Sequence, residues 1–279
     1  MDWKGREQSQ NVEDRRGSSG GGGGGRTPGI LGIIVVLVGA YYGVDLSGLV
    51  GTPSMGTGST QTSQLKPQEE AELNELARVV LADTEKAWGS YFKQIGRTYT
   101  PTTMVLYNGG TSTACGMGQS AMGPFYCPGD QKVYLDLDFY RDMQTKLNSA
   151  SDAAFAYVIA HEVGHHVQNL LGILPKVHRM QQQVGKKEAN ALSVKLELQA
   201  DCYAGIWGHY AVNNNIFKAE DITKAMLAAE SVGDDRLQKE GQGYVVPDSF
   251  THGSSEQRMA WLKRGLDSGD INQCNTFGN

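Results

Sequence analysis

The chain has 279 residues, of which 39% are hydrophobic and 20% are charged, as expected for a globular protein of one or two domains. Its formal net charge is −5, so the strongly basic surface of a nucleic-acid-binding protein is not expected. The four cysteines include no CxxC pair, which argues against a cysteine-rich zinc ribbon.

The N-terminal quarter of the chain differs in composition from the rest. Residues 1–28 are polar, charged and glycine-rich, without apolar periodicity, and are expected to be a flexible cytoplasmic tail. Residues 29–50 carry no charge apart from Asp45 and are just long enough to cross a bilayer, so we expect a single transmembrane helix. A buried core helix would have no neighbours between such flanks, and no clear cleavage site of a signal peptide follows. Residues 51–66, rich in serine, threonine and glycine, are expected to be a linker.

The charges before the apolar stretch predict how the chain lies across a membrane. Five basic residues precede it, namely Lys4, Arg6, Arg15, Arg16 and Arg26. The positive-inside rule then predicts a single-pass protein of the cytoplasmic (inner) membrane with its N-terminus in the cytoplasm. Everything after about residue 50 would lie in the periplasm or outside the cell, where disulfides can form.

The remaining residues, 67–279, are expected to form one folded domain. A helix is predicted from its first residue onward, and strands are predicted within 97–109 and 131–140. The second strand alternates apolar and polar side chains, which is typical of a half-exposed strand. The remainder is mostly helical, apart from a loop predicted over 233–258 and a short final helix. The pattern predicts an α+β fold that is mostly helical with a small sheet.

The motif AHEVGHH, residues 160–166, places two histidines four positions apart in a predicted helix. Positions i and i+4 share a face, so His161 and His165 project side by side, as two imidazoles that bind one ion must. Glu162 lies at the edge of that face, where it can reach a metal-bound water without binding the metal. This is the arrangement of an H-E-x-x-H zinc site. His166 points away from the face and is expected at the surface.

A catalytic zinc usually has three protein ligands and one position open to water. The pattern H-E-x-x-H-x-x-G-x-x-H fails here, because Leu171 occupies the place of its last histidine. A later predicted helix, residues 193–211, offers Glu197 as the third ligand. Asp201, four residues on, is expected to accept the second N–H of a ligand histidine. His209 on the same helix is an alternative third ligand.

Two disulfides are predicted. Cys115 and Cys127 bracket a glycine-rich segment just before the second strand, where a bond would brace one wall of a substrate site. Cys202 and Cys274 would pin the C-terminal end to the helix that carries the acidic ligand. The alternative is four reduced, buried thiols.

These motifs resemble those of a family of bacterial membrane proteins named "putative neutral zinc metallopeptidase". The similarity covers nearly the whole chain, including NVEDRRGSSG, YYGVDLSGL, GQSAMGPFYCPGDQKVYLDLDFY, AHEVGHHVQNLLGI, LELQADCYAGIWGH, VGDDRLQ and PDSFTHGSSEQR. The resemblance implies a zincin-like fold and a glutamate-ligand (gluzincin-type) peptidase. It does not supply a substrate.

The segment DSFTHGSSEQR also resembles a histidine-bearing loop of membrane-anchored gluzincins that precedes a helix with an arginine. The resemblance implies that His252 and Arg258 hold the carbonyl oxygen as it becomes negative. The alternative is an ordinary helix N-terminus, capped by Ser254 or Ser255, with Glu256 complementing the helix dipole.

The first hypothesis is therefore a membrane-anchored zinc metallopeptidase, an endopeptidase that acts on peptides or proteins. One zinc ion held by His161, His165 and Glu197 would activate a water, with Glu162 as general base. The strand over 132–139 could present its edge to an extended peptide. The alternatives are a non-catalytic zinc-containing peptide-binding or scaffold protein of the cell envelope, and a membrane adaptor without a metal.

Overall fold

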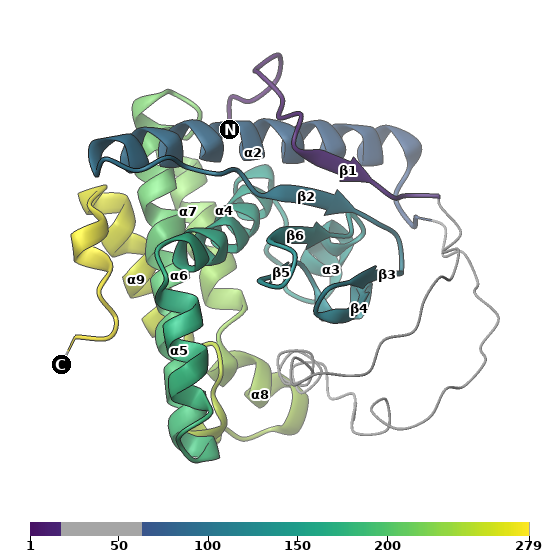
Figure 1. Ribbon diagram of the computed structural model, residues 1–279. Coiled ribbons are helices and arrows are strands. Elements are labelled where there is room, and N and C mark those ends of the chain that lie inside the picture. Colours follow the sequence, from purple (N-terminus) through teal and green to yellow (C-terminus); the bar gives the residue numbers. More distant parts are fainter. Residues whose placement is uncertain (18–62, 279) are drawn as a thin grey trace.

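A computed structural model describes residues 1–17 and 63–278, which are mostly helical (Figure 1). The helices are α2 (Pro67–Gln94), α3 (Phe139–Thr145), α4 (Asp152–Leu170), α5 (Ile173–Gln181), α6 (Lys186–Asn213), α7 (Ala219–Ser231), α8 (Asp234–Gln242) and α9 (Ser255–Ser268). The strands are β1 (Val12–Asp14), β2 (Thr103–Leu106), β3 (Gly110–Thr113), β4 (Gly116–Gln119), β5 (Phe125–Cys127) and β6 (Lys132–Leu135). The predicted α+β class, mostly helical with a small sheet, is confirmed.

The predicted transmembrane helix, residues 29–50, lies outside the described residues. So does most of the predicted linker, residues 51–62. Within 1–17 and 63–278, no helix combines the length and apolar character that crossing a bilayer requires.

Four strands form the main sheet, in the order β1-β2-β6-β5 (Figure 1). The first three are parallel to one another, and β5 runs antiparallel to β6. The two remaining strands, β3 and β4, form a separate antiparallel hairpin. A mostly parallel sheet of this kind needs cover on both faces. The long helices α2, α4 and α6 supply most of the hydrophobic core beside it.

The predicted half-exposed strand over 131–140 is wrong in two respects. Strand β6 is interior to the sheet, and its residues Val133, Tyr134 and Leu135 are all buried. Successive side chains point to opposite faces, so Leu135 joins the main core while Tyr134 packs in a second cluster on the other face. The apolar periodicity also runs past the strand into α3, which begins at Phe139.

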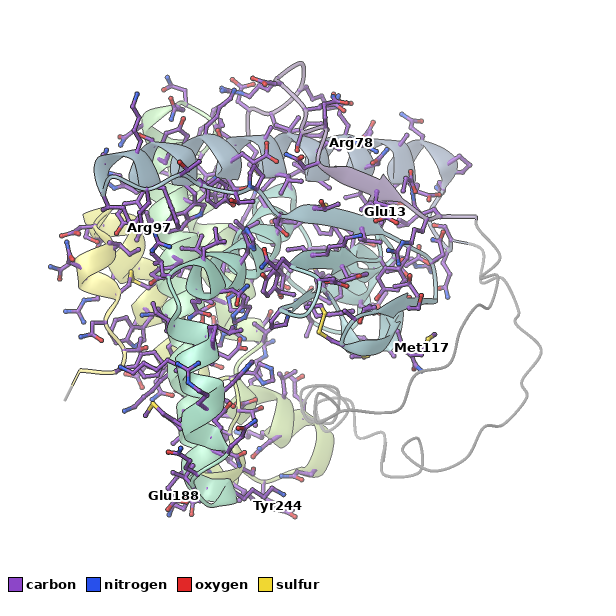
Figure 2. The ribbon with its side chains drawn as sticks, in the orientation of Figure 1. Glu13, Arg78, Arg97, Met117, Glu188 and Tyr244 are labelled. Carbon is purple, nitrogen blue, oxygen red and sulfur yellow. A yellow bond between two sulfur atoms is a disulfide. The ribbon has the colours of Figure 1, made fainter. Side chains whose placement is uncertain are left out.

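Residues 1–17, here called the N-terminal arm, are folded onto the domain, so the predicted flexible tail is wrong for this part of 1–28. In Figure 1 the arm crosses α2 and forms β1, one of the two edge strands of the sheet. The backbone N–H of Ser9 donates to the carbonyl of Arg78 on α2 at 3.0 Å. Figure 2 labels Arg78 and, further along the arm, Glu13. A polar strand at a sheet edge is held by backbone hydrogen bonds, which apolar periodicity does not reveal.

The crossing helices α4, α6 and α9 approach one another closely at glycines. A Cβ atom at Gly164 in α4 would lie 3.1 Å from the carbonyl oxygen of Ala200 in α6. Between α6 and α9 the space is smaller still, since a Cβ at Gly265 would lie 2.0 Å from the carbonyl oxygen of Cys202. These contacts bring the polar residues of α4, α6 and α9 together in the interior.

The loop predicted over 233–258 is wrong for Asp234–Gln242, which form α8. This helix is short and almost entirely polar, and Leu237 is the side chain that packs against the main core. A helix with so few apolar positions gives little periodicity in the sequence. The predicted final helix is confirmed as α9.

Both predicted disulfides are present. Cys115 in the turn between β3 and β4 is bonded to Cys127 at the end of β5, and Cys202 in α6 is bonded to Cys274 near the C-terminus. In Figure 2 a disulfide appears as a yellow bond beside the hairpin that carries Met117. All four cysteines are thus paired, and the alternative of four reduced thiols is wrong.

Candidate metal site

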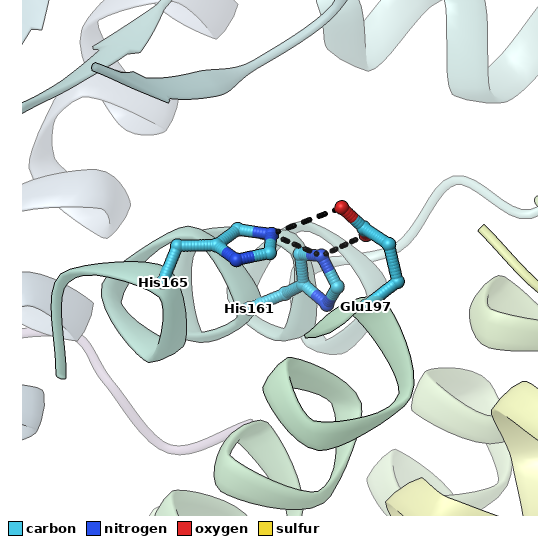
Figure 3. Close-up of side chains that lie close together, drawn as sticks. All are labelled: His161, His165 and Glu197. Atoms are coloured by element: carbon cyan, nitrogen blue, oxygen red, sulfur yellow. Dashed lines mark hydrogen bonds and ion pairs between the residues drawn. The ribbon is translucent and has the colours of Figure 1, made fainter. Parts of the chain in front are cut away.

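Helix α4 presents the two histidines of the H-E-x-x-H motif on one face. Its N-terminus is capped by Ser151, whose hydroxyl accepts a hydrogen bond from the backbone N–H of Ala154 at 3.0 Å. The helix is buried over most of its length, and His161 itself is 6% exposed. Packing of α4 against α6 sets the histidines opposite Glu197 (Figure 3).

Ligand-type atoms of three residues converge at this point. The Nε2 atom of His161 lies 3.0 Å from Oε2 of Glu197 and 3.2 Å from Nε2 of His165. The third separation, from His165 Nε2 to Glu197 Oε1, is 3.4 Å. Ligand atoms at zinc–ligand distances of 2.0–2.2 Å in a tetrahedron are separated by about 3.3 Å. The three residues therefore have the spacing and the chemistry of a zinc site.

The other ring nitrogens of these histidines have partners that fix their protons. The Nδ1–H of His161 donates to Oδ1 of Asp201 at 2.8 Å, and the Nδ1–H of His165 donates to Oε1 of Gln168 at 2.9 Å. The amide nitrogen of Gln168 donates to the carbonyl of Leu196, which orients its oxygen toward the imidazole. In the neutral tautomers set in this way, both Nε2 atoms carry lone pairs. Two lone pairs and a carboxylate that face one another repel, and either a proton or a metal ion between them removes this repulsion.

The charged groups around the cluster also favour a positive charge at this point. Burial lowers the pKa of His161, but Asp201 and Glu197 outweigh this effect and raise it to about 10. Glu197 raises the pKa of His165 against a similar effect of burial. The pKa of Glu197 lies well below its usual range, because the histidines overcome the effect of burial. A positive charge is thus strongly favoured at the site, whether it comes from protons or from a metal ion.

Glu162 is buried next to this cluster but is not one of the three converging residues. No hydrogen bond to its carboxylate is present among residues 1–17 and 63–278. Burial raises its pKa, while the neighbouring histidines lower it in part. An unpaired carboxylate whose pKa lies above its usual range is suited to accepting a proton near neutral pH.

Arg258 does not lie where the resemblance implied. Its Nε–H and Nη2–H donate to the two carboxylate oxygens of Asp201 at 2.8 and 3.0 Å, and Nη1–H donates to the carbonyl of Val232 at 3.3 Å. Tyr157, one turn before His161, also donates its hydroxyl to Asp201, at 2.6 Å. The guanidinium is therefore committed to Asp201, the carboxylate that accepts the Nδ1–H of His161.

His252 is held in a loop next to the cluster. Its Nδ1 lies 3.4 Å from Oδ1 of Asp234, whose other oxygen accepts the backbone N–H groups of Thr251, His252 and Gly253. Burial lowers the pKa of His252, but Asp234 and Glu197 raise it overall. The helix-cap alternative is also present, since Ser254 caps α9 with Gln257 in a capping box.

Two further histidines are placed away from the cluster. The structure buries His166 completely, between the hydroxyl of Tyr126 at 2.9 Å and the carbonyl of Thr100 at 2.7 Å, so the expected surface position is wrong. It joins strand β5 to α4. His209 contacts the carbonyl of Leu266 and does not belong to the converging group.

Sequence reasoning missed the polar residues that orient the cluster. Gln168 lies three residues after His165, and Tyr157 lies four residues before His161, so helical spacing alone could have suggested both. Asp234 had no such signal, because it comes from α8, far from the motif along the chain.

Comparisons with known proteins place these residues in a wider group. A family model described as "Putative neutral zinc metallopeptidase" matches residues 1–277. The protein named "Uncharacterized protein YpfJ" from Escherichia coli (strain K12) is 54% identical over 287 aligned residues, covering 100% of this chain and 99% of that protein. "Uncharacterized protein Rv2575" from Mycobacterium tuberculosis (strain ATCC 25618 / H37Rv) is 40% identical over 222 residues, covering 74% of this chain and 73% of that protein. No solved structure matches the chain.

Proposed function

This chain belongs to the family described as "Putative neutral zinc metallopeptidase", and from its site we propose that it hydrolyses peptide bonds with one zinc ion. The observation that carries the proposal is the convergence of His161, His165 and Glu197 with ligand atoms 3.0–3.4 Å apart. The fourth position of such a site is left for water. We also propose a zincin-like arrangement of the domain and endopeptidase activity.

Zinc at this site would polarise the scissile carbonyl and lower the pKa of a water to about 7. Glu162 accepts a proton from the attacking water and later donates it to the departing amine. Asp201, held by Arg258 and Tyr157, keeps the His161 ring oriented with its Nε2 lone pair toward the cluster.

His252 is proposed to stabilise the carbonyl oxygen as negative charge develops on it. The support is electrostatic: Asp234 favours the protonated imidazole, and Glu197 in the cluster acts on the same ring. A protonated imidazole is a charge-assisted donor, which is the stronger kind of hydrogen bond to an oxyanion.

A substrate peptide cannot pair with the edge of the strand within residues 132–139, as the sequence suggested. Strand β6 is paired on both sides, by β2 and β5, and has no free edge. We propose that an extended peptide lies along the outer edge of β5, Phe125–Cys127, which no other described strand pairs. This strand lies next to α4, because the hydroxyl of Tyr126 contacts His166 on that helix.

Attachment to a membrane through residues 29–50 remains part of the proposal. The two disulfides support placement of the domain in an oxidising compartment, the periplasm or the outside of the cell. Proteins of the reducing cytoplasm rarely keep such bonds.

The test is to replace Glu162 by glutamine in the full chain. We expect unchanged zinc content by elemental analysis and a loss of peptide hydrolysis of at least about 100-fold, because the proton acceptor is gone. The matched control is Glu188→Gln, at the exposed start of α6. Zinc-loaded Glu162→Gln protein with full activity would remove Glu162 from this role. Zinc binding without hydrolysis by the unaltered chain would favour the non-catalytic alternative.

A further inference from the structure

The N-terminal arm is bonded to the domain along its length. At its end, the backbone N–H of Arg15 donates to the carbonyl of Leu106 at 2.8 Å and extends the pairing of β1 with β2. Near its start, Trp3 is 4% exposed, and its Nε1–H donates to Asp152 at the beginning of α4 at 2.8 Å. The arm thus completes the sheet and contacts the helix that carries the H-E-x-x-H motif.

The basic residues of the arm are paired within the folded unit. Lys4 lies 3.9 Å from Glu72, and Arg16 lies 2.9 Å from Glu70, both on α2. These are side chains on which the positive-inside rule relies to place the N-terminus in the cytoplasm. In the docked arm these side chains instead bind acidic residues of α2, which adds to the contacts that hold the arm on the domain.

The described residues on the two sides of the segment 18–62 both lie near the start of α2. The arm finishes beside Arg16, which contacts Glu70 in the first turn of α2. Ser63, where the described chain resumes, precedes Glu70 by seven residues (70 − 63). Seven residues reach at most about 25 Å. The hydrocarbon core of a bilayer is about 30 Å thick, and the headgroup regions add to that distance.

We propose that the N-terminal arm and the domain from residue 63 onward lie on the same side of the membrane. A single crossing by residues 29–50 would place β1 and β2 on opposite faces and abolish their pairing. The disulfides of the domain then assign the arm, too, to the oxidising compartment. This arrangement replaces the expected cytoplasmic tail, and it does not depend on peptidase activity.

The first test uses the accessibility of single added cysteines in the full chain. Gln10→Cys in the arm and Ser268→Cys at the end of α9 are both at exposed positions. Each variant is treated with a membrane-impermeant maleimide in spheroplasts and again after permeabilisation. The two variants are expected to react alike under each condition. Reaction of Ser268→Cys in intact spheroplasts, with Gln10→Cys reacting only after permeabilisation, would overturn the proposal.

The second test needs no substitution. A zero-length carbodiimide applied to isolated membranes joins carboxylates to amines that are in contact. Cross-linked peptides are expected for Glu7 with Lys86, which are 2.7 Å apart, and for Glu13 with Lys132, at 2.8 Å. The pair Lys187–Asp248, at 3.0 Å within the domain, is the internal control. Detection of the control pair without either pair from the arm would contradict docking.

Discussion

When they are neutral, the two imidazoles of the cluster leave Nε2 unprotonated, because each Nδ1–H faces an oxygen that accepts a hydrogen bond. For His161 the acceptor is Asp201, a fully buried carboxylate that Arg258 neutralises with two hydrogen bonds. A buried carboxylate without a cationic partner would be unfavourable. Arg258 on α9 therefore allows Asp201 on α6 to remain charged and to orient His161 on α4. Three helices thus determine which nitrogen of His161 carries the proton.

Replacing Asp201 by asparagine is expected to weaken zinc binding by roughly 10- to 100-fold, because His161 loses its charged acceptor. Competition with a chromophoric chelator measures the affinity. Tyr157→Phe removes a neutral donor to the same carboxylate and is expected to have a smaller effect. Unchanged zinc affinity in folded Asp201→Asn protein would show that the aspartate does not support the ligand.

Protons and zinc compete for the cluster, which predicts a pH dependence of metal binding. In the metal-free chain His161 has a pKa of about 10 and is protonated at neutral pH, whereas a ligand histidine must be neutral. Zinc affinity should therefore rise as pH increases from 6 toward 10, and binding should release protons. Calorimetry in buffers of different ionisation enthalpy measures this release. An affinity that stays constant across this range would contradict the prediction.

The raised pKa of His161 also makes the stability of the metal-free chain depend on pH. The folded-state pKa of His161 lies above its unfolded value of about 6.5. Protonation of His161 therefore stabilises the fold fully below about pH 6.5, and this contribution is lost as pH rises toward 10. Bound zinc supplies the positive charge in place of the proton, so the zinc-loaded protein should not show this loss in thermal unfolding.

At the scale of elements, the stacking of α4, α6 and α9 depends on small residues at the crossings. Gly205 and Gly265 face each other where α6 meets α9, and a Cβ on either would lie closer than 3 Å to backbone atoms of the partner helix. The close approach has a functional consequence, because α9 also carries Arg258 and must lie near Asp201. Larger residues at the crossing would move the arginine away from its partner.

Gly265→Ala is expected to destabilise the protein by about 3 kcal/mol or more, because backbone atoms of α6 cannot move as a flexible side chain would. Unfolding in urea measures the change. Gly241→Ala in α8 is the matched control, since a Cβ there meets no atom within 4 Å. The control should be neutral, or stabilising by up to about 1 kcal/mol through helix propensity. Equal stability of the two variants would show that the crossing tolerates a Cβ.

At the scale of the whole molecule, contacts distant in sequence close the fold at both ends of the chain. The N-terminal arm adds β1 to the sheet, and the disulfide Cys202–Cys274 holds the C-terminal end against α6. The side-chain amide of Gln199 also donates to the carbonyl of Cys274 at 3.0 Å. The C-terminal end of the chain thus holds α6, the helix that carries Glu197, in place.

The two disulfides are expected to differ in their contribution to stability. Cys202 and Cys274 are 72 residues apart, and Cys115 and Cys127 are 12 apart. Loop-closure entropy then predicts losses of about 4 and about 3 kcal/mol, respectively, when each pair is replaced by serines. Denaturant unfolding of the two double variants measures both. A larger loss for the shorter loop would indicate that native packing, and not chain entropy, sets the difference.

The sequence by itself determined the features that are local. Helical spacing put His161 and His165 on one face, and the same spacing related Glu197 to Asp201. The type and rough position of α2, α4, α6 and α9 followed in the same way. The reason is that helix periodicity is set by residues within a few turns, whatever the rest of the chain does. The cysteine pairings were also predicted, from positions beside the strand and the ligand helix.

Only the tertiary structure decided the features that depend on which elements meet. Arg258 was expected to bind a carbonyl oxygen, but it binds Asp201. The close crossing of α6 and α9 leaves its guanidinium beside this buried carboxylate. Strand β6 has no free edge, and residues 1–17 contribute strand β1 to the sheet; neither was predicted. Both features are decided by backbone pairing between segments distant in sequence. Backbone hydrogen bonds are nearly independent of side-chain identity, so the sequence carries little trace of which strands will pair.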